Sequence, residues 1–390
     1  MGNEDPKCLF CHLNGWPEPK PVVFDVDSGM RFCVFHAPAT LKRKALGSEE
    51  LLSDDEFNHL VFERIEETVC HECQTGVGTW CELSGTIFPS HMDFRLYQTG
   101  TPLPTINFWD ADFTKGADFT GVEFSSHVQM GKAKFRGPTD LRGTIFRIGP
   151  VDMRDLTSAS LENLIFTRSE LPSLTFNECT WPRRLGLEVH GQGSLTECEE
   201  LYRAMKQRAA AEHDQPMVSC WHYREKLMGL KKLLGEKSWE AQALLKTVED
   251  DTATLRQRFA SWRRLFATIP WTVRRSVLFW YWTLSGFDER PRRAGWSLFA
   301  LAALSLPLFL ALKLVETHPW QVPLRPDFPA MLAAVGEWLR CMPLVKLEYK
   351  PDPDLPFIGP VRFILNWAFQ TLITLQATLF DFTLRNQYRR

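Results

Sequence analysis

The sequence has almost no net charge, since 45 Lys and Arg residues against 47 Asp and Glu residues leave a formal charge of −2. Without a basic excess there is no overall field to attract nucleic acid, which disfavours nucleic acid as a partner. The first eight residues, MGNEDPKC, contain no basic and apolar regions of the kind that make a signal peptide. Pro6 also breaks the pattern required for N-myristoylation. We therefore expect no export signal at this end of the chain.

Motifs of the common enzyme classes are also missing. The sequence has no GxSxG, no phosphate-binding loop, no HExxH and no residues in a plausible triad order. We therefore predict that the protein is not an enzyme and assign no catalytic residue. The ten cysteines are scattered, with six of them among the first 81 residues. Without an export signal we expect reduced thiols or metal ligands and no disulfides.

Two cysteine-containing pairs near the N-terminus have the spacing of metal ligands. Cys8 and Cys11 form one pair, and Cys33 and His36 form the other after 21 intervening residues. Two x2 pairs on turns can converge into a tetrahedral Cys3His site, so we predict a structural Zn²⁺ site here. Unligated thiols are the alternative, and His12 is a rival ligand to His36.

A second, weaker group consists of Cys70, Cys73 and Cys81, with His71 between the first two. These residues could form another zinc site, but no obvious fourth ligand follows, and Cys81 could simply start the next core. Between the two groups, Ser53-Asp54-Asp55-Glu56 is a capping box. It predicts an amphipathic helix whose apolar face contains Phe57, Leu60, Val61 and Ile65.

Large apolar residues repeat with a short fixed period in the next part of the chain. From Phe108 to Phe146 their spacing alternates between five and six, and from Leu156 to Trp181 it is five. A second inward candidate lies two places earlier, as at Ala111, Ala117 and Ala159, and the residue just before is often Asp or Asn. A short repeat of this kind indicates a solenoid in which each step is one side of a stacked turn of chain.

This pattern resembles the pentapeptide-repeat family, with its small–polar–Leu/Phe–x–x repeat. The resemblance covers about a quarter of the chain and implies a right-handed quadrilateral β-helix without a shared catalytic residue. The alternation of five- and six-residue steps departs from the family pattern. The chain also resembles bacterial membrane proteins of this family that have a C-terminal, channel-like pair of helices. This further resemblance is in the segments WHYREK, YWTLSGFDERPRRAGW and LRNQYRR.

The predicted fold class is therefore multi-domain. We expect a small zinc-binding module with a capping helix at 1–80, the β-helix at 81–185, and an α-helical hairpin with an interfacial helix at 186–289. A two-span transmembrane α-helical domain would follow at 290–390. Its spans are predicted at about 296–315 and 363–384, with a short re-entrant or outer helix at about 328–342.

The second predicted span has a polar stripe. It comprises Asn366, Gln370, Thr371, Thr374, Thr378 and Asp381. Polar groups in hydrocarbon are costly unless they meet water or one another. The stripe could line a pore in an oligomer, or it could pack against another helix through hydrogen bonds. Arg residues flank both spans on one side, which predicts a bacterial inner-membrane protein with both termini in the cytoplasm.

Two functions follow as hypotheses. The first is an oligomeric channel or pore-forming effector in the lipid bilayer, controlled by a cytoplasmic sensor region and acting in antiviral (anti-phage) defence. The second is a membrane-tethered pentapeptide-repeat adaptor that binds a protein or nucleic-acid partner on its β-helix. A homo-oligomer is expected for the first, because two spans cannot enclose a pore alone.

Overall fold

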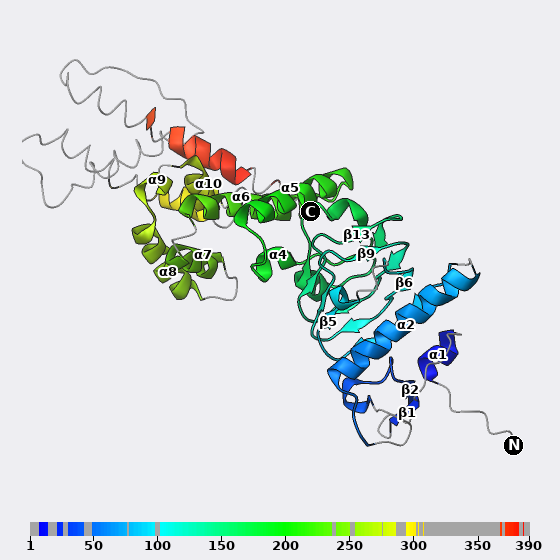
Figure 1. The fold of residues 1–390 in the computed structure, drawn as a ribbon. Helices are drawn as coiled ribbons and strands as arrows, with labels where there is room; N and C mark the ends of the chain where they lie inside the picture. Colours follow the sequence, from blue (N-terminus) through cyan, green and yellow to red (C-terminus); the bar gives the residue numbers. More distant parts are fainter. Residues whose placement is uncertain are drawn as a thin grey trace, which may run out of the picture. The chain divides into compact units, whose positions relative to one another are not determined.

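The protein divides into two compact units, residues 1–201 and 202–390, in a computed structural model (Figure 1). The structure describes residues 8–14, 22–25, 30–42, 49–75, 78–97, 102–235, 239–249, 254–274, 276–285, 294–301, 303, 307, 367–368, 371–381 and 385. The two units are considered separately below.

The N-terminal unit begins with a small module and a long helix. The module contains α1 (Leu9–Asn14), the antiparallel pair β1 (Val22–Asp25) and β2 (Met30–Cys33), and a short 3-10 helix, η1 (Ala39–Leu41). Helix α2 (Asp54–Thr75) follows. The predicted capping box is confirmed, because the Ser53 backbone N–H donates to Glu56 and the Glu56 N–H donates to the Ser53 hydroxyl. Phe57 on α2 packs against Phe35 and Phe88.

Short parallel sheets make up the rest of this unit. All of their strands contain two residues. One sheet contains β3 (Cys81–Glu82), β6 (Ile106–Asn107), β10 (Val128–Gln129), β14 (Val151–Asp152) and β16 (Leu174–Thr175); a second contains β4 (Ile87–Phe88), β7 (Asp112–Phe113) and β11 (Lys134–Phe135); a third contains β5 (Met92–Asp93), β8 (Ala117–Asp118), β12 (Thr139–Asp140) and β15 (Leu164–Ile165); and a fourth contains β9 (Glu123–Phe124) and β13 (Ile145–Phe146).

The strand register follows the sequence period. Ile106 pairs with Val128 and Ala117 pairs with Thr139, so partners in the middle of the unit are 22 residues apart, the sum of two five- and two six-residue steps. The large residues of that period face inward, as predicted. Phe108, Phe113, Phe119, Phe124, Met130, Phe135 and Leu141 are at most 1% exposed. Their rings stack between successive strands, with 4.4 Å between the ring centres of Phe88 and Phe113. The core of the unit is this column of side chains.

Helical segments interrupt the regular pattern after Phe146. These are the short helices α3 (Ser158–Asn163) and α4 (Gly186–Val189) and the 3-10 helix η3 (Leu171–Ser173). Another 3-10 helix, η2 (Phe94–Leu96), lies earlier, after β5. The prediction that Ala159 faces inward is wrong, because this residue is exposed on α3. The five-residue spacing predicted a strand at this segment, and the structure has helix α3 there instead.

Helices dominate the C-terminal unit. They are α5 (Leu195–Ala211), which begins in the N-terminal unit, α6 (Gln215–Leu234), α7 (Trp239–Glu249), α8 (Leu255–Thr268), α9 (Trp271–Arg274) and α10 (Val277–Ser285), and residues 294–301 and 371–381 are also helical. Trp282 is fully buried in their core and stacks on Trp262 at 5.2 Å. Trp282 therefore belongs to the packed interior and the partly buried Trp262 packs against it, within the segment for which the sequence predicted an interfacial helix.

The predicted fold class is wrong as stated. The described residues form an α/β arrangement of several short parallel sheets and helices, in place of a regular pentapeptide-repeat β-helix joined to a two-span transmembrane domain. Within the described part of the chain, no helix combines the length and apolar character needed to cross a membrane. The inner-membrane localisation is corrected on this finding. Most of the span predicted at 296–315, and all of the helix predicted at 328–342, lie outside the described residues.

Candidate metal centre

Four predicted ligands come from three neighbouring elements of the N-terminal module. Cys8 immediately precedes α1 and Cys11 lies on it, so one helical turn directs both thiols to the same side. Cys33 is the last residue of β2, and His36 lies in the turn that follows. In that turn the N–H groups of His36 and Ala37 both donate to the Cys33 carbonyl oxygen, at 3.2 and 2.9 Å. The turn thereby returns the imidazole toward the Cys33 sulfur.

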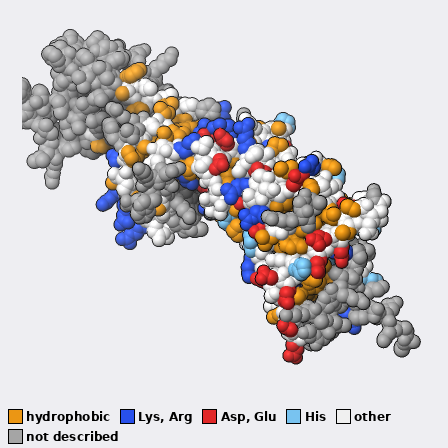
Figure 2. All heavy atoms as spheres, viewed as in Figure 1, with side chains coloured by type: hydrophobic (Ala, Val, Ile, Leu, Met, Phe, Trp, Pro, Cys, Tyr) orange, Lys and Arg blue, Asp and Glu red, His pale blue; other side chains and the backbone are white. Residues whose placement is uncertain are grey.

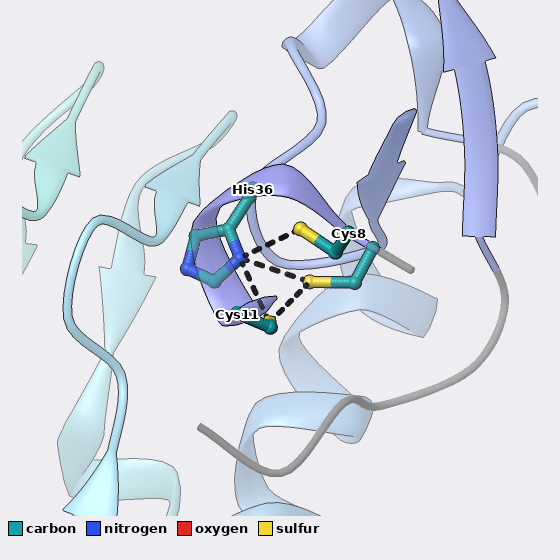
Figure 3. A group of neighbouring side chains, drawn as sticks. Cys8, Cys11 and His36 are labelled. Atoms are coloured by element: carbon teal, nitrogen blue, oxygen red, sulfur yellow. Dashed lines mark hydrogen bonds between the residues drawn. The ribbon is translucent and has the colours of Figure 1, made fainter. Parts of the chain in front are cut away.

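The side chains of Cys8, Cys11 and His36 point toward one another (Figure 3), and the Cys33 thiol belongs to the same converging group. His36 Nδ1 lies 3.5 Å from the Sγ atoms of Cys8 and Cys11, and 3.0 Å from that of Cys33. The Cys11 and Cys33 sulfurs are 3.8 Å apart. In a tetrahedral zinc site, bonds of about 2.3 Å to sulfur and 2.05 Å to nitrogen place two sulfurs about 3.8 Å apart and sulfur and nitrogen about 3.6 Å apart. The observed spacing therefore fits a tetrahedral metal ion.

Burial and mutual proximity set the protonation of the thiols. All four residues are at most 6% exposed. Hydrogen bonds from Cys11 and Cys33 lower the pKa of Cys8, whereas the pKa of Cys11 is raised because its thiol bonds to, and would ionise beside, Cys33 and Cys8. Burial lowers the pKa of His36, but bonding to Cys33 and Cys8 outweighs it and raises that pKa to about 10. Three buried thiols can ionise together only when a cation compensates their charge, which a bound metal would do.

A second layer of contacts orients the imidazole of His36. Its Nε2 donates to the backbone oxygen of Ser84 at 2.8 Å, which directs Nδ1 toward the thiols. Gly85 is in the left-handed region, and a Cβ there would lie 3.5 Å from the imidazole. The Ile87 N–H donates to the Phe35 oxygen at 2.9 Å. The site therefore ties the N-terminal module to the first strands of the stacked sheets.

A buried lysine completes the surroundings of the site, and the sequence offered no signal for it. Lys42 is 2% exposed, and its ammonium donates to the backbone oxygens of Val34 and Phe35, the two residues between Cys33 and His36. The same group lies 4.2 Å from the centre of the Phe57 ring. Burial lowers its pKa to about 7, although the nearby Cys33 acts in the opposite direction. Lys42 thus fixes the turn that presents two of the ligands.

Other candidate ligands lie apart from this group. His12 is exposed on α1 and is not among the converging side chains, so the structure favours His36. Cys70 and Cys73 are exposed on α2, whereas Cys81 is buried and its thiol points to the Arg64 carbonyl oxygen at 3.8 Å. Burial raises the pKa of Cys81 to about 11. The structure does not bring these three cysteines together.

The predicted pore-lining residues are only partly described. Asn366 and Gln370 lie outside the described residues. Thr371, Thr374, Thr378 and Asp381 are exposed, and the hydroxyls of Thr371 and Thr378 donate to carbonyl oxygens four residues earlier in their own helix. The buried polar residue of this helix is Gln376, whose amide donates to the backbone oxygens of Leu284 and Ala294. The sequence pattern missed Gln376, because it lies off the stripe.

No family model matches the chain, and neither the curated proteins nor the solved structures contain a match to it. The resemblance to membrane-anchored pentapeptide-repeat proteins is corrected on this result and on the lack of a membrane-crossing helix among the described residues. The predictions of an ion channel and of a role in antiviral defence depended on those spans and are withdrawn with them.

Proposed function

We propose that the protein is a non-catalytic scaffold that binds a protein partner, and that Cys8, Cys11, Cys33 and His36 hold a structural zinc ion. The observation that carries this proposal is the tetrahedral spacing of four buried ligands that join the N-terminal module to the first strands. A small module of this kind lacks a large core of its own, and metal binding is a common substitute for one.

The donor set favours zinc over other metals. Three thiolates and one imidazole suit a soft to borderline ion with tetrahedral preference, and hard ions such as Mg²⁺ prefer oxygen. Four protein ligands leave no open position for water or substrate, which argues for a structural role. Three thiolates with Zn²⁺ have a net charge of −1, and the Lys42 ammonium, which donates to the backbone of the turn between Cys33 and His36, offsets it.

Charge pairing on the stacked sheets favours a protein partner over nucleic acid. Arg136 pairs with Asp112, Lys134 with Asp110 and Arg142 with Asp140. Basic and acidic side chains are accordingly interspersed over these sheets (Figure 2). Phosphate binding needs basic groups that are free to replace counterions, and these are already paired. Ile145 and Ile148 are about half exposed at 53% and 49%, and they offer an apolar contact beside β9.

Metal analysis tests the zinc assignment. The full chain, purified without added metal, is compared with Cys33→Ser and with Cys198→Ser, which removes a buried thiol outside the site. We expect Cys33→Ser to contain one zinc ion fewer per chain and Cys198→Ser to match the wild type. Equal zinc content in all three proteins would refute the assignment.

Site-directed crosslinking tests the scaffold role. A photoreactive residue at position 148 should capture one discrete protein in cells of the source organism, whereas the same residue at position 178, which is also exposed, should not. The charged double variant Ile145→Asp/Ile148→Asp, with the photoreactive residue placed at Arg147, should lose the product. Capture that is equal at both positions, or unaffected by the double variant, would contradict a specific docking surface.

A further inference from the structure

The last two turns of α2 expose a pair of thiols. Cys70 and Cys73 are both exposed, and so are His71, Gln74 and Thr75. Residues three apart on a helix lie on the same face with Cβ atoms about 5–6 Å apart. Two Sγ atoms on such a face can approach to the roughly 3.8 Å that a tetrahedral metal requires. The two cysteines can therefore act together as a bidentate metal ligand.

The charges around this pair of cysteines favour the binding of a cation. Glu66, Glu67 and Glu72 are on the same stretch of helix, and no basic residue lies in its last turn. The nearest Arg of the helix, Arg64, faces Glu67 at 3.5 Å. The negative end of the helix dipole adds to this field. Such surroundings attract a divalent metal ion to the two sulfur ligands.

The chain itself does not complete the site. Cys81 is fully buried and turned toward Arg64, so it cannot join the exposed pair. Among the described residues, Cys8, Cys11, Cys33 and His36 form the only group of three or more ligands close enough to share a metal. Two thiols alone leave half of a tetrahedral shell unfilled.

We propose that Cys70 and Cys73 form half of a tetrathiolate metal site, which the same two cysteines of a second copy of the chain complete. A twofold axis through the metal makes each copy contribute the same pair, as a symmetric dimer contact requires. The exposed last turns of α2 leave room for a second helix to approach. The ligand is a thiophilic divalent ion of the zinc class. This site is independent of the structural site at Cys33 and His36.

Metal stoichiometry and molecular mass test the proposal together. Wild type, Cys70→Ser/Cys73→Ser and the control Cys179→Ser/Cys220→Ser, which alters two half-buried thiols elsewhere, are purified as full chains with Zn²⁺. We expect about 1.5 zinc ions per chain and a dimer for wild type and control, and about 1.0 and a monomer for the Cys70/Cys73 variant. Because the substituted positions are exposed, the variant should have the circular-dichroism spectrum of the wild type, which shows that it is folded.

Cobalt substitution adds a spectroscopic readout. The difference between the Co²⁺ spectra of wild type and the Cys70/Cys73 variant should have the intense thiolate-to-cobalt bands of four sulfur ligands. Equal metal content and equal mass in wild type and variant would overturn the proposal. So would two metal ions per chain in a monomer, because each pair would then bind alone. Cys33→Ser should lose only the structural zinc and keep the metal-linked dimer. A failure of the structural zinc assignment can therefore be distinguished from a failure of this second site.

Discussion

At the scale of single residues, an Asp or Asn that directly precedes or follows an inward-facing residue has a defined structural role at five positions. The side chains of Asp93, Asn107, Asp118, Asp140 and Asp152 each accept a hydrogen bond from the backbone N–H two residues later, at 2.8–3.2 Å. Asx turns of this type bend the chain at the end of a strand. The sequence pattern predicted which large residues face inward, whereas the role of these Asp and Asn side chains in the turns was not part of that prediction.

The left-handed corners could not be predicted in the same way. Gly85, Asp110, Lys132, Asp155 and Glu178 all have φ near +60°, and they occupy equivalent corners about 22–25 residues apart. Four of these five are not Gly, so composition alone did not reveal the column. Hydrogen bonds between successive turns of chain outweigh the unfavourable left-handed conformation of these non-glycine residues. The N–H of Asp110 donates to the backbone oxygen of Gly131, and the N–H of Lys132 donates to that of Arg154.

Substitutions at two glycines should distinguish the cost of a left-handed backbone from the cost of a steric clash. Gly116 and Gly121 both have positive φ, but an added Cβ would lie 1.9 Å from the Pro138 oxygen at Gly116 and would meet nothing within 4 Å at Gly121. Gly121→Ala should cost about 1–2 kcal/mol of unfolding free energy from the left-handed conformation alone. Gly116→Ala should cost at least about 1 kcal/mol more, because backbone must move. Urea unfolding of both variants measures the difference, and equal costs would contradict the close approach of the two strands.

A buried carboxylate makes stability depend on pH. Glu170 accepts hydrogen bonds from the Thr167 N–H and hydroxyl and from the Gly143 N–H. Burial alone would raise its pKa, but these bonds outweigh burial and lower it below the usual value. A lowered carboxyl pKa adds stability that is present above the unfolded pKa of about 4.3 and is lost as pH falls through the folded pKa.

Glu170→Gln should therefore lower stability by about 1.5–3 kcal/mol at pH 7, the usual value of hydrogen bonds to a charged group. The deficit should shrink as the pH falls from 5 toward 3. Denaturant unfolding at several pH values measures it, with the exposed substitution Glu178→Gln as the control. A deficit that stays constant over this range would show that the Glu170 charge does not contribute.

At the scale of elements, helix α3 protects the edge of a sheet. The Ser160 hydroxyl donates to the Ala133 oxygen at 3.1 Å and accepts from the Phe135 N–H at 3.3 Å, and the Asn163 amide donates to the Phe135 oxygen at 2.9 Å. These side chains replace the strand that would otherwise pair with β11. The sequence did not reveal this exchange, because Leu161 keeps the five-residue spacing and is buried whether its segment is strand or helix.

Removing the Ser160 hydroxyl should destabilise the N-terminal unit. Ser160→Ala leaves the Phe135 N–H buried without its hydrogen bond, which costs about 1–3 kcal/mol. Ser158→Ala is the matched control, since it makes the same chemical change at a partly exposed position of the same helix. Thermal or denaturant unfolding compares them, and similar losses for the two would show that α3 does not cap the strand.

At the scale of the whole molecule, hydropathy was the least reliable of the sequence signals used to predict the architecture. The apolar runs at 296–315 and 363–384 predicted membrane spans, but Gln376 is 3% exposed and bonds to the oxygens of Leu284 and Ala294. An apolar stretch packed on other helices and one packed on lipid have the same composition, so composition cannot distinguish them. Within the segment 186–289, for which the sequence predicted a helical hairpin, the structure has the consecutive helices α5 and α6 on either side of Asp214.

The metal-ligand spacing was the most informative local signal, because four specific side chains must meet at fixed distances. His36 was identified from its x2 spacing to Cys33, whereas its contact with Ser84, 48 residues away, left no trace in the sequence. That contact makes the metal centre a joint between the N-terminal module and the stacked sheets. The N-terminal module should therefore lose its structure when the metal is removed, and the sheets beyond it should not.

Amide hydrogen exchange of the full chain, with and without a zinc chelator, tests this central claim most directly. We predict that chelation removes protection at residues 31–42 and at Ile87, whose N–H bonds to Phe35, while residues 106–152 in the stacked sheets keep theirs. Cys33→Ser should reproduce the chelated pattern without chelator. Unchanged protection at residues 31–42 after the metal is removed would contradict a structural metal at this site.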